Sequence, residues 1–388
     1  MNRTIALLSL GFGLALATPQ LSVQAQPPLE WSNPHRQATS LGFDEQLWES
    51  FRGSGDKQAL IESINNSLRY LNTPGAAKAY EDYSIPWITR DRVRRSLLRF
   101  RELVRNSNSP EELQAAVKRE FVFYKSVGSS RYDGKVFFTG YYEPIYEASR
   151  VPTADYQYPL YRRPANLDSW DTPHPSRTQL EGMDGSGKNS PLAGGELVWL
   201  RDRLQAFLVH IQGSARLKLP NGEIMSVGYH GSTDYPYTSI GQAMIRDGLH
   251  PADGFTLPKM IGLFRQNPDL LNVYLPKNNR FIFFRETHGA PPMGSIGVPV
   301  TADRSIATDK SIMPPGALAL IHTQMPIPNG RGGMNTPTVS RFVLDQDTGS
   351  AIKSPGRVDI FMGTGEQAGD RAGVTGYRGE LYYLLLKE

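Results

Sequence analysis

The stretch Gln346–Gly373 reads QDTGSAIKSPGRVDIFMGTGEQAGDRAG, and it carries two aspartates beside strand-like apolar runs. Asp359 lies between two apolar residues in RVDIF, and Asp347 opens a DTG turn. Burial disfavours the charged form of a carboxyl group, so its pKa rises unless the group is paired. A raised pKa suits a general acid at neutral pH. Asp359 is the stronger candidate, because turn aspartates such as Asp347 often only accept hydrogen bonds from turn amides.

The order Asp347-Thr348-Gly349 is also the order at the catalytic turn of aspartic proteases, which need a second aspartate to share one proton. The nearest second candidate is Asp184 in MDGSGK, within a Gly/Ser-rich loop that has no apolar lead-in. The sequence therefore argues against a peptidase. Asp303 in PVTADRSIA does emerge from an apolar run, and it joins Asp347 as a candidate supporting carboxylate for Asp359.

Composition favours a β-rich, turn-rich protein. Gly (37) and Pro (29) are plentiful among the 388 residues, and 10% are aromatic, which favours β-structure over a helical bundle. The formal charge of +4 suits either an acidic polymer as substrate or ordinary solubility, and no lysine-rich stripe indicates nucleic acid. The absence of cysteine excludes disulfides, a thiol nucleophile and a lipid-bearing cysteine.

The first 25 residues have the pattern of a secretory signal. Arg3 precedes a short apolar run, and Val23-Gln24-Ala25 is typical of a cleavage site. The run is short for a membrane span, so we expect cleavage rather than an uncleaved anchor. The expected location is the periplasm or cell envelope.

Periodicity divides the remaining chain into a helical front and a strand-rich remainder. Helical spacing of apolar residues dominates from about residue 27 to 128, with a serine cap and Pro110 opening the last helix. Short aromatic alternating runs then predict strands, with Pro220-Asn221-Gly222 as a hairpin turn. The whole of 197–231 is expected to be strands and turns, and Met362–Gly369 is expected to precede no helix. The predicted helices are 44–73, 89–106, 109–126, 239–249 and 257–275, and the later strands are 280–286, 297–309, 316–326, 341–352, 357–363 and 381–387. This order predicts an α+β fold with two β-barrel-like parts.

Four motifs of the sequence, taken together, resemble those of a known family. FFTGYYEP at 137–144, HIQGSARLKLPNG at 210–222, VGYHGSTDYPYTSIGQAMI at 227–245 and the quoted stretch are similar, in the same order, to MltA-type lytic murein transglycosylases with a C-terminal three-aspartate (3D) domain. The resemblance implies a double-psi β-barrel catalytic domain with N-terminal helices, an inserted second β-barrel domain and a groove between the two. The implied boundaries are a signal peptide at 1–25, the helical part and first catalytic strand at 26–142, the insert at 143–284 and the 3D domain at 285–388.

The same resemblance implies Asp359 as the catalytic aspartate, with Asp347 and Asp303 as companions. Members cleave the β-1,4 bond between N-acetylmuramic acid and N-acetylglucosamine without water, forming a 1,6-anhydro ring. Because the attacking hydroxyl belongs to the same sugar, one acid that later acts as the base is expected to be enough. The alternatives are a non-catalytic glycan-binding or wall-loosening module and a peptidoglycan hydrolase on the same fold. The best-known member is a lipoprotein, which this cysteine-free chain is not expected to be.

Six further residues are candidate substrate contacts. Thr139, Tyr141 and Tyr142 combine a hydroxyl with flat aromatic faces, which suits either a sugar groove or core packing. Gln212 and Ser214, expected in a strand, suit contacts to N-acetyl groups.

Lys353 suits a carboxylate of the substrate or a solvated turn. His210 is expected to be a structural hydrogen-bonding residue. The spacing of His230 and Asp234 matches no strong metal template, and the three aspartates lack the dense spacing of a calcium loop. No metal and no cofactor are therefore predicted.

Peptidoglycan glycan strands are the expected partner, and a monomer is the expected state. The N-terminal helices are expected either to pack on the barrel or to dock a cell-wall synthesis or division complex, and the sequence leaves both open.

Overall fold

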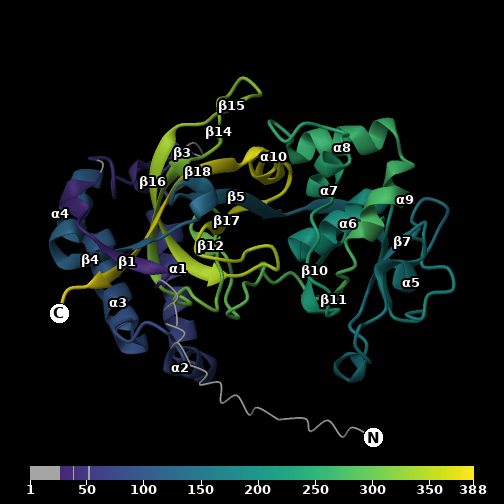
Figure 1. Ribbon diagram of the computed structural model, residues 1–388, viewed down its shortest axis with the longest axis horizontal. Coiled ribbons are helices and arrows are strands. Elements are labelled where there is room, and N and C mark those ends of the chain that lie inside the picture. The colour runs from purple at the N-terminus through teal and green to yellow at the C-terminus, as the bar shows by residue number, and fades with distance from the viewer. Residues whose placement is uncertain (1–26, 38, 51–52) are drawn as a thin grey trace, which may run out of the picture.

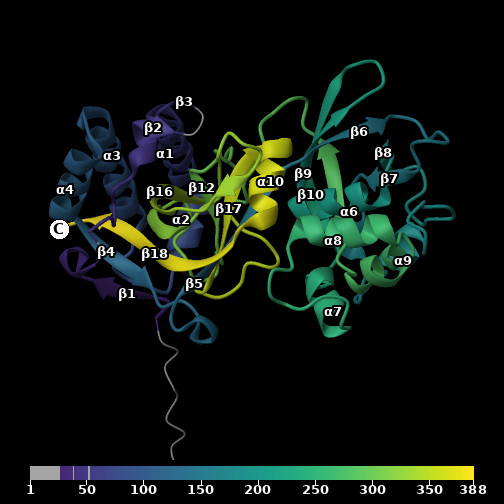
Figure 2. The same ribbon diagram turned by 90° about the horizontal axis from the view of Figure 1, so that it is seen from above.

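Two β-sheets lie side by side in the structure, a computed structural model that describes residues 27–37, 39–50 and 53–388 (Figure 1). The predicted signal peptide at 1–25 lies outside the described residues. Helices cover the outer end of each sheet, and the two sheets meet near strand β5 (Val136–Glu143) and helix α10 (Glu366–Val374) (Figure 2). The predicted α+β class is confirmed. No helix within the described part of the chain is long and apolar enough to span a membrane.

The larger sheet has eight strands, and six of them close into a barrel. Closure follows because β18 pairs with β13 on one side and with β5 on the other. Two pairs in the ring, β12–β16 and β17–β5, are parallel. The strands in sheet order are β1 (Leu29–Ser32), β4 (Phe121–Ser126), β18 (Gly376–Leu386), β13 (Leu318–Gln324), β16 (Thr338–Asp347), β12 (Ser305–Ala307), β17 (Arg357–Thr364) and β5 (Val136–Glu143).

The second sheet has six strands from the middle of the chain. A single bridge between Arg162 and Phe284 connects its two edges. The predicted hairpin at 220–222 joins two of its antiparallel strands, and Gly222 has the positive φ of +85° that such a turn requires. The strands in order are β11 (Ile282–Glu286), β10 (Ile224–Ser232), β9 (Ser214–Lys218), β6 (Ile145–Ser149), β8 (Glu196–Leu200) and β7 (Tyr158–Tyr161).

Four N-terminal helices pack on the barrel as the apolar periodicity requires. Helix α3 contacts β18 and α1 contacts β16. Thr73, Thr89 and Ser109 each accept a hydrogen bond from the first helical turn, so the predicted serine cap is confirmed. These helices are α1 (Lys57–Leu71), α2 (Pro74–Glu81), α3 (Arg90–Asn106) and α4 (Pro110–Glu120). Later helices are α5 (Arg177–Glu181), α6 (Arg203–Gln212), α7 (Ile240–Arg246), α8 (Leu257–Gln266), α9 (Leu270–Tyr274) and α10 (Glu366–Val374). The shortest strands are β2 (Glu49–Ser50), β3 (Gly53–Ser54), β14 (Ile327–Pro328) and β15 (Met334–Asn335).

Four local predictions are wrong. Within the predicted helix 44–73, helix α1 begins only at Lys57, and Glu49–Ser50 and Gly53–Ser54 pair as the short strands β2 and β3. Residues 121–126 form strand β4 instead of extending the helix, because they pair with both β1 and β18. Residues 203–212 form helix α6, where a nearly continuous apolar run hid the helical period. Its cap residues, Asp202 before it and Gly213 after it, were the available signal. Residues 366–374 form helix α10, which begins inside the stretch 362–369 that was expected to precede no helix.

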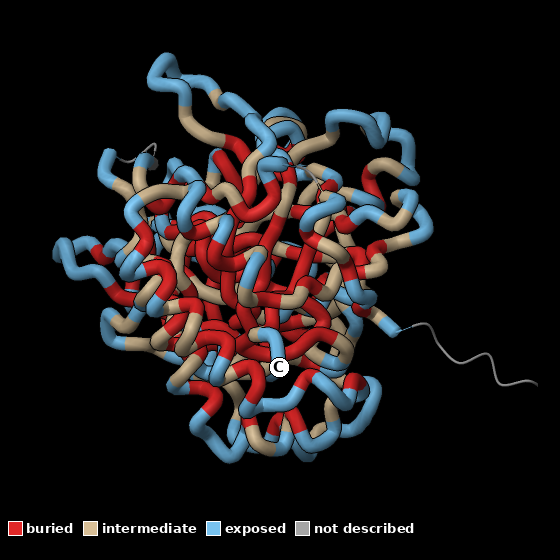
Figure 3. Tube along the Cα trace, turned by 90° about the vertical axis from the view of Figure 1, so that its left-hand side faces the viewer, coloured by how far each residue is buried: buried red, intermediate tan, exposed pale blue. Residues whose placement is uncertain are grey.

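Buried residues gather in the middle of the molecule, with exposed chain around them (Figure 3). Within that interior, a charged cluster ties the N-terminal segment to the barrel. Arg304 is fully buried and donates to Asp44 at 2.5 Å and to Asp56 at 2.5 Å. Arg341 adds a second contact to Asp44 at 3.2 Å. Each buried charge in this cluster has a partner of opposite sign. Removal of one partner would leave the other charge buried and unpaired, which destabilises the folded protein.

Replacement of Arg304 by Met leaves the Asp44 carboxylate buried without its main partner. We expect the free energy of unfolding to fall by about 3–5 kcal/mol. Denaturation in urea, monitored by circular dichroism, measures the change. The matched control is Arg94→Met, which removes only an exposed pair with Asp91 and should leave the unfolding midpoint unchanged. An equal effect of the two changes would contradict this role of Arg304.

Candidate active site

One row of residues crosses the barrel and brings the candidate carboxylates together. Ala307 in β12 pairs with Asp347 in β16 on one side and with Asp359 in β17 on the other. Asp359 in turn pairs with Thr139 in β5. Neighbouring strands are about 4.8 Å apart, so the backbones of the two aspartates are separated by roughly 10 Å with only a methyl group between them. Segments more than 200 residues apart in sequence therefore form one site.

Asp359 has the properties expected of an acid that holds its proton near neutral pH. Its Oδ1 accepts a hydrogen bond from the Thr139 hydroxyl at 2.9 Å. Burial raises the pKa of Asp359 to about 6, against the opposing effects of the Arg357 charge and the Thr139 hydrogen bond. The negative charge of Asp347 adds a smaller rise. The environment in β17 is thus sufficient to keep a substantial fraction of this carboxyl protonated at pH 6.

Arg357 lies two residues before Asp359 on the same face of β17. Its Nη2 donates to the Thr139 hydroxyl oxygen at 3.0 Å, and its guanidinium lies 5.1 Å from the centre of the Phe137 ring. Thr139 therefore accepts from Arg357 and donates to Asp359, which fixes the direction of its hydroxyl proton. This arginine limits how far burial can raise the pKa of the acid.

Asp347 is surrounded by donors from the protein itself. Its Oδ2 accepts from the Tyr141 hydroxyl at 2.7 Å, and its Oδ1 accepts from the backbone amides of Ser295 and Thr348, each at 2.8 Å. Burial raises the pKa of Asp347, and these three hydrogen bonds oppose the rise. Because both of its oxygens already accept hydrogen bonds, Asp347 is suited to an indirect role: it holds the Tyr141 hydroxyl, and its charge raises the pKa of Asp359.

A groove of about 1010 Å³ opens beside Asp359, between the barrel and the second sheet. The barrel contributes Thr139, Arg357 and Asp359 to its lining. The opposite wall contributes Tyr237 and Arg280 from the segment around β10 and β11. The Asp359 charge is among the causes that raise the pKa of Tyr237, so this phenol is within electrostatic range of the acid. The groove has the hydroxyl, aromatic and cationic groups that polar oligosaccharides require.

Of the predicted aromatic contacts, the structure brings Tyr141 to the groove and turns Tyr142 inward. Tyr141 lines the groove while it binds Asp347. Tyr142 is buried, with its hydroxyl 3.4 Å from that of Tyr146. Its backbone amide donates to the Gln212 side-chain oxygen at 3.0 Å. Gln212 ends α6, a helix and not the expected strand, and it also lines the groove.

Two other predicted contacts lie elsewhere. Ser214 opens β9 and is not part of the groove lining. Lys353 is exposed in the turn after β16, outside the lining, and its charge lowers the pKa of Asp309. Neither position has a described contact that favours a substrate role.

Asp303 does not extend the carboxylate row, which corrects the sequence-based expectation. Its carboxylate pairs with Arg371 of α10 at 2.6 Å, and both side chains are 1% exposed. The same guanidinium donates through Nε to the Pro326 carbonyl oxygen at 2.9 Å. Asp303 therefore holds α10 on the barrel.

His210 accepts a hydrogen bond from the Ile282 amide at 3.1 Å through Nδ1, the structural contact that was predicted for it. Burial lowers its pKa well below the ordinary value. His230 and Asp234 are not brought into a metal-binding group. Among residues 27–37, 39–50 and 53–388, no cluster of three or more His, Asp or Glu side chains could hold a metal ion.

Sequence reasoning missed Arg357 and Tyr237. The signal for Arg357 was the strand period of two, which places it on the same face as Asp359. Tyr237 lay within a quoted motif, but nothing local distinguished it from its neighbours.

Two family models match the chain and together span more than half of it. The model of the MltA specific insert domain matches residues 137–285, and that of the 3D domain matches residues 304–385. The chain belongs to the MltA family. The resemblance read from the motifs is confirmed.

Curated relatives and solved structures agree with this membership. Membrane-bound lytic murein transglycosylase A of Escherichia coli K12 is 29% identical over 259 residues, which are 66% of this MltA-family chain and 67% of the relative. The protein of that name from Vibrio cholerae is 28% identical over 265 residues, 67% and 68% of the two chains. A membrane-bound lytic murein transglycosylase from Agrobacterium tumefaciens superposes with a TM-score of 0.67 at 28% identity, over 85% of this chain and 93% of the other. The structure of E. coli MltA with bound chitohexaose shares the fold, with a TM-score of 0.69 at 24% identity over 94% and 95% of the two chains.

The Arg357 charge can be tested by titrating the acid directly. In Arg357→Met the pKa of Asp359 should rise from about 6 by about one unit, because the change removes a nearby cation that favours the carboxylate. Carbon-13 NMR of the Asp359 carboxyl as a function of pH measures the value. Arg378→Met is the control, because Arg378 also lines the groove but is not a main cause of the Asp359 shift. A fall in the Asp359 pKa of Arg357→Met would contradict the arrangement.

Proposed function

We propose that this chain is a lytic murein transglycosylase that cleaves the β-1,4 bond between N-acetylmuramic acid and N-acetylglucosamine in peptidoglycan. The observation that carries the proposal is Asp359, a carboxyl group with a pKa of about 6 at the wall of a large groove. The curated relatives are named for this activity, which supports the same assignment here.

Asp359 acts first as the acid. Its proton passes to the glycosidic oxygen as the bond from that oxygen to C1 of muramic acid breaks. The C6 hydroxyl oxygen of the same sugar then bonds to C1 and its proton returns to the Asp359 carboxylate. The products are a 1,6-anhydromuramic end and a new N-acetylglucosamine end, and no water is consumed. Asp359 is restored to its starting form at the end of the cycle.

An intramolecular nucleophile explains why one catalytic carboxylate is sufficient. A well-oriented hydroxyl of the same molecule lowers the activation free energy by up to roughly 7–11 kcal/mol, compared with attack by a separate molecule from solution. Most glycosidases instead use a second carboxylate to activate water or to form a covalent bond. Asp347 is the nearest other carboxylate in the row, and its oxygens are already bound by Tyr141, Ser295 and Thr348. In this proposal it positions Tyr141 and raises the pKa of Asp359.

Binding of the glycan is assigned to the groove between the two sheets. We propose that Thr139, Tyr141 and Gln212 contact the strand, together with Tyr237 and Arg280. Tyrosine faces suit the apolar side of a sugar ring, and amide and guanidinium donors suit N-acetyl and hydroxyl oxygens. We also propose the domain division inferred from the motifs, with the insert at 143–284 and the catalytic 3D domain at 285–388. The site of action is the cell envelope.

Replacement of Asp359 by Asn tests the acid. The amide cannot donate the proton to the leaving oxygen, so release of 1,6-anhydro products should fall by at least about a thousandfold while the groove still binds chitohexaose. Mass spectrometry of digested murein measures the products, and calorimetry measures the binding. Asp253→Asn is the control, because Asp253 is exposed on the same groove and the change is chemically the same.

The outcomes separate this proposal from the two rival functions. Products heavier by one water, with reducing ends, would identify a hydrolase. Intact murein with full glycan binding in the wild type would identify a binding module. Retained anhydro products in Asp359→Asn would contradict the role of Asp359.

The pKa of the Asp359 carboxyl group predicts the pH dependence of the reaction. The acid must be protonated in the free enzyme, so kcat/KM should fall as the pH rises through about 6. Initial rates of anhydro product release between about pH 4 and about pH 8, roughly two units on either side of that pKa, measure the profile. A rate that rises steadily across this range would be inconsistent with Asp359 as the acid.

A further inference from the structure

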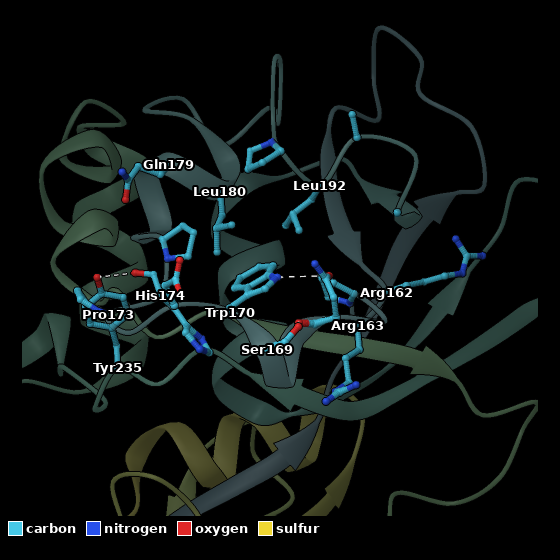
Figure 4. Close-up of a pocket in the computed structure, with 17 residues that line it drawn as sticks. Arg162, Arg163, Ser169, Trp170, Pro173, His174, Gln179, Leu180, Leu192 and Tyr235 are labelled. Atoms are coloured by element: carbon cyan, nitrogen blue, oxygen red, sulfur yellow. Dashed lines mark hydrogen bonds between the residues drawn. The ribbon is translucent and has the colours of Figure 1, made fainter.

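A second cavity, of about 830 Å³, lies on the insert and shares no lining residue with the groove. Figure 4 shows Trp170 in the middle of its lining, with Leu180 and Leu192 on one side and Arg163 near the opposite side. The Trp170 ring is held edge-on by Phe283, with the ring centres 6.0 Å apart at 89°. This cavity combines a fixed apolar floor with polar groups around it.

Three polar side chains in the lining have their acceptor atoms already occupied by the protein. Gln179 Oε1 accepts from the Ser176 amide at 2.8 Å, in the capping box of α5. Asn166 Oδ1 accepts from the Trp170 indole at 3.3 Å. His174 Nδ1 accepts from the Asp234 amide at 3.2 Å, which leaves the proton of the neutral ring on Nε2.

The donor atoms of the same side chains have no described partner. Gln179 Nε2, Asn166 Nδ2 and His174 Nε2 are therefore available to a ligand, and each can only donate. Arg162 and Arg163 also line the cavity, but both guanidinium groups already have partners in the protein: Arg163 pairs with Asp168 at 2.5 Å, and Arg162 donates to the Glu196 carbonyl oxygen. A cavity with these unused amide and imidazole donors favours a ligand rich in carboxylate and carbonyl oxygens.

The cavity and the groove lie on either side of one short segment. Tyr235 lines the cavity and Tyr237 lines the groove, two residues further on. Arg280, a groove residue, donates to the Tyr235 carbonyl oxygen at 3.2 Å. The two linings therefore adjoin along this segment, which a branch of a strand bound in the groove would cross to enter the cavity.

We propose that the Trp170 cavity binds the peptide stem of the murein strand. This inference rests on the proposed function, because it assigns the branch of the same substrate. Murein stems are short peptides with several free carboxylates, amide carbonyls and small methyl side chains. The carboxylates and carbonyls match the unused donors, and the methyl groups match the apolar surface of Trp170 and Leu180. Chitohexaose is a poorer match, because it has no carboxylate to accept from these donors.

Gln179→Glu is the sharpest test, because it changes the ligand contact and preserves the fold. Glutamate can take the place of glutamine in the capping box, so α5 should be retained. The change replaces a donor by a negative oxygen facing the ligand carboxylates. Calorimetry with a synthetic stem tetrapeptide should show binding weakened by about ten- to a hundredfold. Affinity for chitohexaose, which has no peptide, should be unchanged.

Gln205→Glu is the matched control. Like Gln179, Gln205 is the third residue of its helix on the same insert, although the cap of that helix is Asp202. Gln205 lies outside the linings of both the groove and the cavity. On stem-bearing strands, Gln179→Glu should raise KM with kcat unchanged, and on strands stripped of stems by an amidase both constants should equal those of the wild type. Gln205→Glu should match the wild type on both substrates.

Equal affinity of the wild type and Gln179→Glu for the stem peptide would overturn the proposal. An equally strong interaction with an acidic peptide of unrelated sequence would also overturn it, and would assign the cavity to a partner protein. If the stem peptide binds and Gln179→Glu weakens it, but the wild type releases no anhydro product, then the cavity assignment is supported and the proposed activity fails. The two proposals are thus tested by separate readouts.

Discussion

Strand β12 hydrogen-bonds along both of its edges, with β16 on one side and β17 on the other, although it is only three residues long. Its last residue, Ala307, is the common neighbour of Asp347 and Asp359. A slip of one residue in either pairing would turn one carboxylate to the opposite face of the barrel. The register is held from outside by the closure of the ring through β18 and by the buried contacts of Arg304, the residue just before β12.

The acid depends on a balance between burial and nearby charge. Burial in β17 raises the pKa of Asp359, and Arg357 on the same face lowers it. Thr139 connects the two, since it accepts from the arginine and donates to the carboxylate. If burial acted alone, the group would hold its proton too tightly to act as the base in the second half of the cycle. If the arginine acted alone, the group would be ionised before it could act as the acid.

The insert supplies the second wall of the groove beside the barrel. The barrel by itself offers one wall with an acid on it, and the segments that flank β10 and β11 supply Tyr237 and Arg280 on the facing wall. The Tyr235–Tyr237 segment then connects the groove with the Trp170 cavity. The insert would therefore contribute to recognition of both the glycan and its peptide branch, while the chemistry stays on the barrel.

The sequence by itself determined the elements whose signals are local. The helices capped by Thr89 and Ser109, the turn at Gly222 and the apolar surroundings of Asp359 were all readable, because caps, turns and strand periods involve neighbours in the chain. Only the tertiary structure decided what each carboxylate contacts. Asp303 and Asp359 both follow apolar runs, yet one pairs with Arg371 and the other faces the groove. The strand pairing that separates them joins residues far apart in sequence, and no local pattern records which long-range partner a buried charge will meet.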